Sequence, residues 1–318
     1  MACFSTNKII EMNILFSSDD NYARHLGVAI YSILCHNEME KIHFFVINNR
    51  ISEANIEKIE LLIKDYENSE VSFIPFDQFE KQLHLNLAWP ISLSSYARLF
   101  VGEMLPADVD RVLYLDCDML INADISDLWN TEMGEYVLGA VQDQVSESVK
   151  LAIGLSLADQ YFNAGMLLID LGKWREAKMG EECLQFIASH NGKVLHHDQG
   201  VLNGVLSHQW YRLPLKYNVM TVHYMMAQSG IKKFYRDEAS FYDKDEITLA
   251  KRDPVILHYT PSFTTHPWEQ HCKHPFRFYY NEALKMTPWK GYPLEKEKNP
   301  WYVKIINFYY RNSPLYRF

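Results

Sequence analysis

Residues 111–120 read RVLYLDCDML, an apolar run that leads directly into two aspartates separated by one residue. The apolar half is typical of a buried β-strand, whereas burial of an unpaired carboxylate is costly. We therefore expect a core strand that leaves the interior at Asp116 and Asp118. Because residues i and i+2 of a strand point to the same side, both carboxylates are predicted to face one ligand, with Cys117 turned away.

The spacing of the acidic pair suggests a cation site. Two neighbouring carboxylates raise each other's pKa unless a cation joins them. Mg²⁺ and Mn²⁺ prefer such oxygen ligands and commonly bridge to substrate phosphates. The alternative is a pair of capping or surface aspartates. His258, in VILHYT, is a third ligand if the sheet brings it beside the pair, and Mn²⁺ accepts imidazole more readily than Mg²⁺; otherwise it is a structural histidine.

The segments around this strand alternate between strand-like and helix-like patterns. Helices are predicted at 22–37, 52–66, 94–105, 173–191 and 198–210. Strands are predicted early in 12–22 and at 41–49, 70–76, 110–120, 135–143, 162–171 and 253–260. This rhythm favours a doubly wound α/β layer with parallel pairing.

Polar residues gather where these strands end. They include Asp19–Asn21 after the first strand, Asp116 and Asp118 after the fourth, and His258 in the last. In open α/β sheets, ligands bind outside the carboxyl ends of the strands. The coincidence of three distant segments therefore predicts a ligand site at this edge.

Composition narrows the class of protein. The chain has 318 residues, 48% of them hydrophobic, so it can bury a large core. Its net charge of −9 argues against a nucleic-acid partner. The sequence shows neither a run of 18 apolar residues nor a secretory signal pattern, and its five cysteines are scattered. These features predict a cytoplasmic protein with reduced thiols, free or bound at the inner face of the cell membrane.

The C-terminal segment differs from the rest of the chain. Residues 271–318 carry a net charge of +6 and hold 13 aromatic residues, whereas residues 1–270 carry −15. We predict a catalytic domain over 1–270 and a basic, aromatic extension over 271–318. The extension is either a terminal helix packed on the domain by its aromatic residues or a contact with an anionic membrane surface.

Six segments, taken together and in order, resemble glycosyltransferase family 8 over roughly residues 12–270. They are FSSDDNY, ISLSSYARLFVGE, RVLYLDCDMLI, YFNAGMLLIDL, HHDQGVLNG and ILHYTPSFTTHPW. The likeness is to bacterial lipopolysaccharide and lipooligosaccharide α-galactosyltransferases and α-glucosyltransferases. It implies the GT-A nucleotide-diphospho-sugar transferase fold: a mainly parallel central sheet flanked by helices, followed here by a helical, aromatic tail.

The resemblance also assigns roles to individual residues. It implies that Ser17, Asp19 and Asn21 contact the uracil and ribose, and that Arg98 contacts the diphosphate and the donor sugar. It implies metal ligands at Asp116, Asp118 and His258. It also implies donor-sugar contacts at Asn163 and Ala164, and catalytic positions beside the anomeric carbon at Asp198 and Gln199. A cation and an arginine on the phosphates suit the negative charge that develops on a leaving UDP. Taken alone, Arg98 fits a helix-surface charge and Asp198 a helix N-cap.

One segment departs from the family pattern His-X-X-Gly-X-X-Lys-Pro-Trp. Here HYTPSFTTHPW has Pro261 where the glycine is expected, two additional residues, and His266 before Pro267. His266 is the candidate for the phosphate contact of the family lysine, a role that requires a protonated ring.

The predicted reaction is metal-dependent, retaining transfer of a galactose or glucose from a UDP-sugar to a saccharide or glycolipid acceptor. The predicted cofactor is Mn²⁺ or Mg²⁺. Two alternatives remain: a haloacid dehalogenase-like phosphatase with Asp116 as nucleophile, and an inactive nucleotide-sugar-binding module. The phosphatase pattern usually has Thr or Val two residues after the second aspartate, where this chain has Leu120. The choice between double displacement on Asp198 and front-face displacement is open, with front-face displacement preferred.

Overall fold

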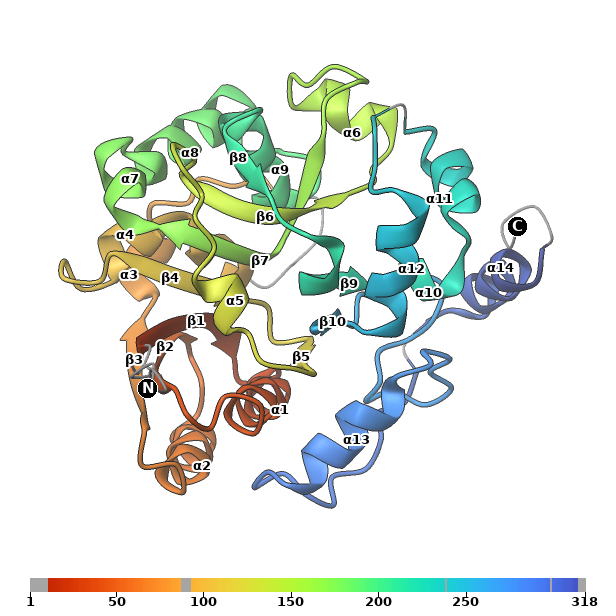
Figure 1. Ribbon diagram of the computed structural model, residues 1–318. Helices are drawn as coiled ribbons and strands as arrows, with labels where there is room; N and C mark the ends of the chain where they lie inside the picture. The colour runs from red at the N-terminus through yellow and green to blue at the C-terminus, as the bar shows by residue number, and fades with distance from the viewer. Residues whose placement is uncertain (1–10, 87–92, 238, 298, 314–318) are drawn as a thin grey trace, which may run out of the picture.

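The computed structural model describes residues 11–86, 93–237, 239–297 and 299–313. Its centre is a seven-stranded sheet with the order β3-β2-β1-β4-β7-β6-β8 (Figure 1). The strands are β1 (Glu11–Asp19), β2 (Lys41–Asn49), β3 (Ser69–Pro75), β4 (Arg111–Leu115), β6 (Leu138–Asp143), β7 (Tyr161–Asp170) and β8 (Trp210–Arg212).

The sheet is mainly parallel, as the sequence predicts. β1, β2, β3 and β4 pair in parallel, and so do β6 and β8. β7 is antiparallel to both of its neighbours, β4 and β6. Side chains of β4 alternate between the two faces of the sheet, so that Leu113 and Leu115 enter one core and Val112 and Tyr114 the other. This double burial explains the continuous apolar run.

The predicted strand 110–120 is wrong in one respect, because the chain leaves the large sheet at Leu115. After a turn it starts β5 (Met119–Ile121), which pairs with β10 (Ile256–His258) in a separate three-stranded sheet. The third strand of that sheet is β9 (Val219–Met220). Asp116 and Asp118 therefore lie in the connection between two sheets.

Helices cover both faces of the large sheet. α1 (Ala23–Leu34) and α2 (Glu53–Lys64) contribute to the core on one face. The 3₁₀ helix η1 (Leu93–Phe100), α4 (Val101–Met104), α7 (Leu171–Glu176), α8 (Met179–Ser189) and α9 (His197–Leu206) contribute to the core on the other. The predicted helix 94–105 is thus a 3₁₀ helix followed by one α-turn. The predicted helix 173–191 is divided near Lys178, which has φ +50°.

Shorter elements complete the described chain. They are α3 (Asp77–Glu80), α5 (Ser126–Trp129), α6 (Glu147–Ala152), η2 (Leu215–Tyr217), α10 (Val222–Met225), α11 (Gln228–Tyr235), α12 (Lys244–Arg252), α13 (Arg277–Lys285) and α14 (Trp301–Asn312). Among the described residues, every helix is too short or too polar to cross a bilayer.

The chain beyond residue 270 contacts the main body before it reaches α14. α13 packs against α1, and the buried Trp289 donates a hydrogen bond to Asn55 Oδ1 over 3.2 Å. A Cβ atom on Gly27 would lie 2.3 Å from the Trp289 ring, so the glycine makes this packing possible. The division at residue 270 stays a prediction. α14 lies at the side of the molecule, near α10 and α11 (Figure 1).

Candidate active site

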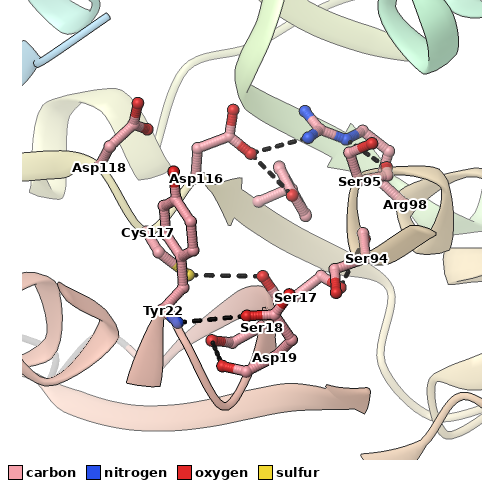
Figure 2. A pocket seen from close by; sticks show the side chains of 11 residues that line it. Ser17, Ser18, Asp19, Tyr22, Ser94, Ser95, Arg98, Asp116, Cys117 and Asp118 are labelled. Carbon is pink, nitrogen blue, oxygen red and sulfur yellow. Dashed lines mark hydrogen bonds and ion pairs between the residues drawn. The ribbon is translucent and has the colours of Figure 1, made fainter. Parts of the chain in front are cut away.

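A cavity of about 250 Å³ opens at the carboxyl ends of β1 and β4 (Figure 2). Five of the predicted site residues line it: Ser17, Asp19, Arg98, Asp116 and Asp118. The other lining residues are Ser18, Tyr22, Ser94, Ser95, Tyr114 and Cys117. The prediction that Cys117 is turned away from the site is therefore wrong, because the chain turns after Leu115 instead of continuing as a strand. The expected edge of the sheet therefore does carry a hollow with acidic and basic groups.

The predicted metal ligands meet at this cavity. One ligand atom each from Asp116, Asp118 and His258 lies within 4.8 Å of the other two. His258 Nε2 is 3.2 Å from Asp118 Oδ1, and its Nδ1 is 3.0 Å from Asn218 Oδ1. Asn218 thus fixes the ring with Nε2 facing the carboxylates, an arrangement common behind metal-bound histidines. Two carboxylates and one imidazole fit Mn²⁺ or Mg²⁺ as a donor set.

The two carboxylates differ in their electrostatic surroundings. Burial raises the pKa of Asp116 above its ordinary value, although Arg98 opposes the shift. Burial acts in the same direction on Asp118, but His258 more than offsets it and holds the pKa of Asp118 at about 2. Asp118 is therefore an anionic ligand throughout the physiological range, and a cation would stabilise Asp116 in the same form.

Arg98 connects the acidic pair to α9. Its Nη2 donates to Asp116 Oδ1 over 2.8 Å, and its Nε lies 3.0 Å from Asp198 Oδ2. Its Nη1 donates to the carbonyl of Ala164, and its guanidinium lies over the Tyr114 ring at 4.3 Å. Figure 2 shows the Asp116 carboxylate directed at this guanidinium. The residue is only 3% exposed, so the interpretation of Arg98 as a helix-surface charge is wrong.

A second network joins the start of β7 to α9. Gln199 Oε1 accepts hydrogen bonds from Asn163 Nδ2 at 3.3 Å and from the Ala164 amide at 3.0 Å. Asn163 Nδ2 and Gln199 Nε2 both donate to Asp143 Oδ2. Asn218 Nδ2 donates to Asn163 Oδ1 over 2.9 Å, which links this network to His258. Four predicted residues, Asn163, Ala164, Asp198 and Gln199, are therefore linked to the metal cluster indirectly, through Asn218 and Arg98.

Asp143 and Asn218 belong to the site but were not predicted from the sequence. Asp143 ends β6, beside Tyr161 of the antiparallel β7, and burial raises its pKa despite hydrogen bonds from Asn163 and Gln199. The one feature of the sequence that could have marked Asp143 as a site residue is its position at the end of the predicted strand 135–143. Asn218 follows the short helix η2, and no pattern in the sequence marks it.

The last residues of β1 and the turn that follows carry three predicted residues, of which Ser17 and Asp19, both in β1, line the cavity. Ser17 Oγ donates to the Ser94 carbonyl over 2.6 Å, and Asp19 Oδ1 accepts from the amides of Asn21 and Tyr22. Asn21 itself is exposed and lines a separate hollow beside Arg50. The structure thus places Ser17 and Asp19 at the site and Asn21 at its margin.

His266 lies near the cluster without lining the cavity. Its ring stacks on Trp268 at 4.4 Å, and Trp268 stacks on His25 at 3.7 Å. Its Nδ1 is 3.6 Å from Glu269 Oε2, and its charge lowers the pKa of Asp118. The aromatic stack therefore fixes the ring beside the acidic pair.

Comparisons with known proteins match this chain to one family over most of its length. Glycosyl transferase family 8 matches residues 13–272. The lipopolysaccharide 1,2-glucosyltransferase of Escherichia coli K12 is 30% identical, covering 88% of this chain and 79% of that protein. General stress protein A of Bacillus subtilis strain 168 is 28% identical, covering 87% and 94%. The crystal structure of galactosyltransferase LgtC with donor and acceptor sugar analogues superposes with a TM-score of 0.71 at 30% identity, covering 87% of this chain and 96% of that one.

Proposed function

The chain belongs to glycosyl transferase family 8, and from this membership we propose that it transfers a galactose or glucose from a UDP-sugar to a saccharide or glycolipid acceptor, with retention at the anomeric carbon. The names of the glucosyltransferase and galactosyltransferase relatives support a hexose. The lipopolysaccharide enzyme supports an acceptor in the cell-surface glycan. The family match also favours transfer over the phosphatase alternative.

One observation carries the proposal: Asp116 is shared between the metal cluster and Arg98. Such sharing places a cation site and a guanidinium at one cavity, as a sugar diphosphate requires. A bound Mn²⁺ or Mg²⁺ would neutralise charge on the leaving UDP. Asp116, Asp118 and His258 would hold it, and Arg98 would contact the same phosphates. Ser17 and Asp19 would hold the uridine, and Asn163 and Ala164 the sugar.

The contacts of α9 support front-face displacement. A double displacement needs a carboxylate nucleophile beneath the anomeric carbon. Asp198 is paired with Arg98, and the Gln199 carbonyl oxygen already accepts two hydrogen bonds. In the proposed route, Asp198 orients Arg98, Gln199 orients Asn163, and the leaving diphosphate takes the proton from the acceptor hydroxyl. A covalent glycosyl adduct on Asp198, found by mass spectrometry of the native enzyme, would overturn this choice.

A hydrolysis assay tests the proposed activity. UDP-galactose, UDP-glucose and their N-acetylated counterparts are incubated with the protein and Mn²⁺, and released UDP is measured. We expect release with one hexose donor, its loss with a chelator, and its loss in Asp118→Asn. Asp108→Asn, at an exposed loop position, is the matched control. No UDP release from any donor would favour the inactive binding module.

The proposal extends to a peripheral membrane contact through residues 271–318. Its support is the net charge of +6 on this segment and the exposure of six apolar or aromatic side chains on α14. These are Trp301, Tyr302, Ile305, Ile306, Phe308 and Tyr309, each at least 47% exposed. Aromatic and aliphatic side chains flanked by lysine and arginine suit the interface of an anionic bilayer.

A further inference from the structure

After α13 the chain returns to residues 266–270, called here the His266 segment, and pairs with them at Glu295. The Glu295 amide donates to the Trp268 carbonyl over 2.8 Å. The Gln270 amide donates to the Glu295 carbonyl over 2.9 Å. These two hydrogen bonds form a parallel bridge between Glu269 and Glu295. The backbone at Glu295 therefore supports the segment that carries His266.

The side chain of Glu295 reaches a third part of the chain, the first turn of α1. Its carboxylate accepts a hydrogen bond from Arg24 Nη2 and lies 3.8 Å from His25 Nε2. His25 is 2% exposed, and its Nδ1 is 2.6 Å from the hydroxyl of Tyr280 on α13. An ion pair between a guanidinium and a carboxylate is stronger than a neutral hydrogen bond. Glu295 thus joins α1 to the His266 segment.

Aromatic rings continue this connection to His266. The Trp268 ring stacks on the His266 ring at 4.4 Å and on the His25 ring at 3.7 Å, with interplanar angles of 11° and 26°. Tyr22, which lines the active-site cavity (Figure 2), meets the rings of His25 and Trp268 edge-on at 5.3 and 6.2 Å. Buried ring contacts of this kind favour particular orientations. They connect the Glu295 carboxylate to the His266 ring.

From this geometry we infer that Glu295 is a positioning residue of the donor site, which holds the His266 ring beside the diphosphate of the bound UDP-sugar. The inference rests on the proposed function, in which that diphosphate is the ligand. The Glu295 side chain is 30% exposed and lies outside the lining of the active-site cavity. Its effect on the donor therefore passes through the ring stack. The chain beyond residue 270 would then take part in donor binding as far as Glu295, separately from α14.

The Michaelis constant for the UDP-sugar tests the inference. Glu295→Gln keeps the size of the side chain and the backbone bridge but removes the charge that pairs with Arg24. We expect KM to rise about fivefold, with kcat changed less than about twofold, because a displaced ring weakens donor binding. Arg24→Lys keeps a cation beside the carboxylate and should raise KM less than Arg24→Gln. An unchanged KM in Glu295→Gln would overturn the inference.

The matched control lies in the same part of the chain. Glu282→Gln removes an ion pair with Lys285 on α13, in which both side chains are exposed, and should leave KM unchanged. A role of Glu295 in folding alone would lower the melting temperature without raising KM of the folded protein. An equal rise of KM in the two variants would reduce the effect to the loss of a negative charge and refute the positioning role.

A double-mutant cycle shows whether Glu295 acts through His266. Residues that act as one unit have non-additive effects. In the His266→Ala background, Glu295→Gln should cause no further rise in KM. The same fivefold rise in both backgrounds, expected for independent residues, would show that Glu295 acts by another route and would overturn the inference.

A measurement without any ligand separates this inference from the proposed function. The Cε1 proton of His266, assigned in the NMR spectrum by its loss in His266→Ala, is shifted by the ring current of Trp268. In Glu295→Gln it should move toward the position of an unstacked histidine. An unmoved resonance would overturn the inference even if the parent releases UDP. A moved resonance, with no UDP release from any donor, would support the positioning of the ring and refute the proposed function instead.

Discussion

A Cβ atom placed on Gly165 would lie 2.5 Å from Cε1 of His258. The same atom would lie 2.9 Å from Asp116 Oδ2, and the Gly165 carbonyl accepts the Asp116 amide over 2.8 Å. The backbone of β7 therefore serves as the wall against which two proposed metal ligands pack. Only a glycine leaves room for both.

The first prediction concerns this wall. Gly165→Ala should displace His258 or Asp116 and lower Mn²⁺-dependent UDP release by about 10- to 100-fold, the usual cost of disturbing the support of a metal ligand. Isothermal titration with Mn²⁺ should show weaker binding. Gly172→Ala is the control, because a Cβ there meets only ordinary contacts. Undiminished Mn²⁺ affinity in Gly165→Ala would show that the site lies elsewhere.

The second prediction concerns Arg98. Arg98→Gln removes the partner of Asp116 and Asp198 and should lower the free energy of unfolding by about 3 kcal/mol, measured by urea denaturation. Arg98→Lys keeps the charge but loses the planar geometry, so it should fold better and still lose most activity. Arg50→Gln removes an ion pair in which the arginine is 65% exposed and should cost less than about 1 kcal/mol. Equal losses of unfolding free energy in Arg98→Gln and Arg50→Gln would contradict the interpretation of Arg98 as the buried partner of Asp116 and Asp198.

The third prediction concerns His266. If its ring contacts the donor diphosphate, His266→Ala should raise KM for the UDP-sugar roughly tenfold, since a charge-assisted hydrogen bond is lost. His266→Lys should restore most of the affinity. Trp268→Leu should resemble His266→Ala, because the stack that holds the ring disappears. His208→Ala, at an exposed position, is the control. A KM unaffected by His266→Ala would remove this residue from the donor site.

The fourth prediction concerns stability against pH. Burial lowers the pKa of His223 to about 3, and neither ring nitrogen has a hydrogen-bond partner among the described residues. An unfolded histidine titrates near 6.5, so the unfolded state binds one more proton between about pH 6.5 and 3. His223 therefore contributes stability above pH 6.5 that is lost as pH falls, by about 1.4 kcal/mol per unit.

Urea denaturation between pH 7 and 4.5 measures this slope. His223→Phe should remove the contribution of about one proton from the slope of unfolding free energy against pH. His208→Gln should leave this slope unchanged. Indistinguishable slopes for His223→Phe and the parent would show that His223 is hydrated or paired in solution.

The parts of the site that follow local rules could be predicted from the sequence. Asp116 and Asp118 stand out because they end an apolar run, although the strand-alternation argument for their common direction was wrong. A turn after Leu115 brings the carboxylates together, and that turn depends on the pairing of β5 with β10 more than 130 residues away. No local pattern contains such a pairing.

The supporting residues were hidden for a different reason. Asn218 acts by orienting His258, and Gly165 acts by what it lacks, so neither has a chemical signature of its own. Asp143 resembles any acidic residue at a strand end until β7 is placed antiparallel beside it. The roles of these supporting residues depend on neighbours that are distant in the sequence. By contrast, the roles of Arg98 and Asp198 could be predicted because both residues lie in the six motifs that resemble the family.

The turn between β4 and β5 has a mechanical consequence. Asp116 directly follows β4 of the large sheet, Asp118 directly precedes β5 of the small sheet, and His258 ends β10 of that small sheet. A cation held by all three would join the two sheets at a second point, in addition to side-chain packing and the hydrogen bond from Asn218 to Asn163. At 100 times its dissociation constant it would add about 2.7 kcal/mol to folding. Hydrogen exchange should then slow in both sheets together when Mn²⁺ is added.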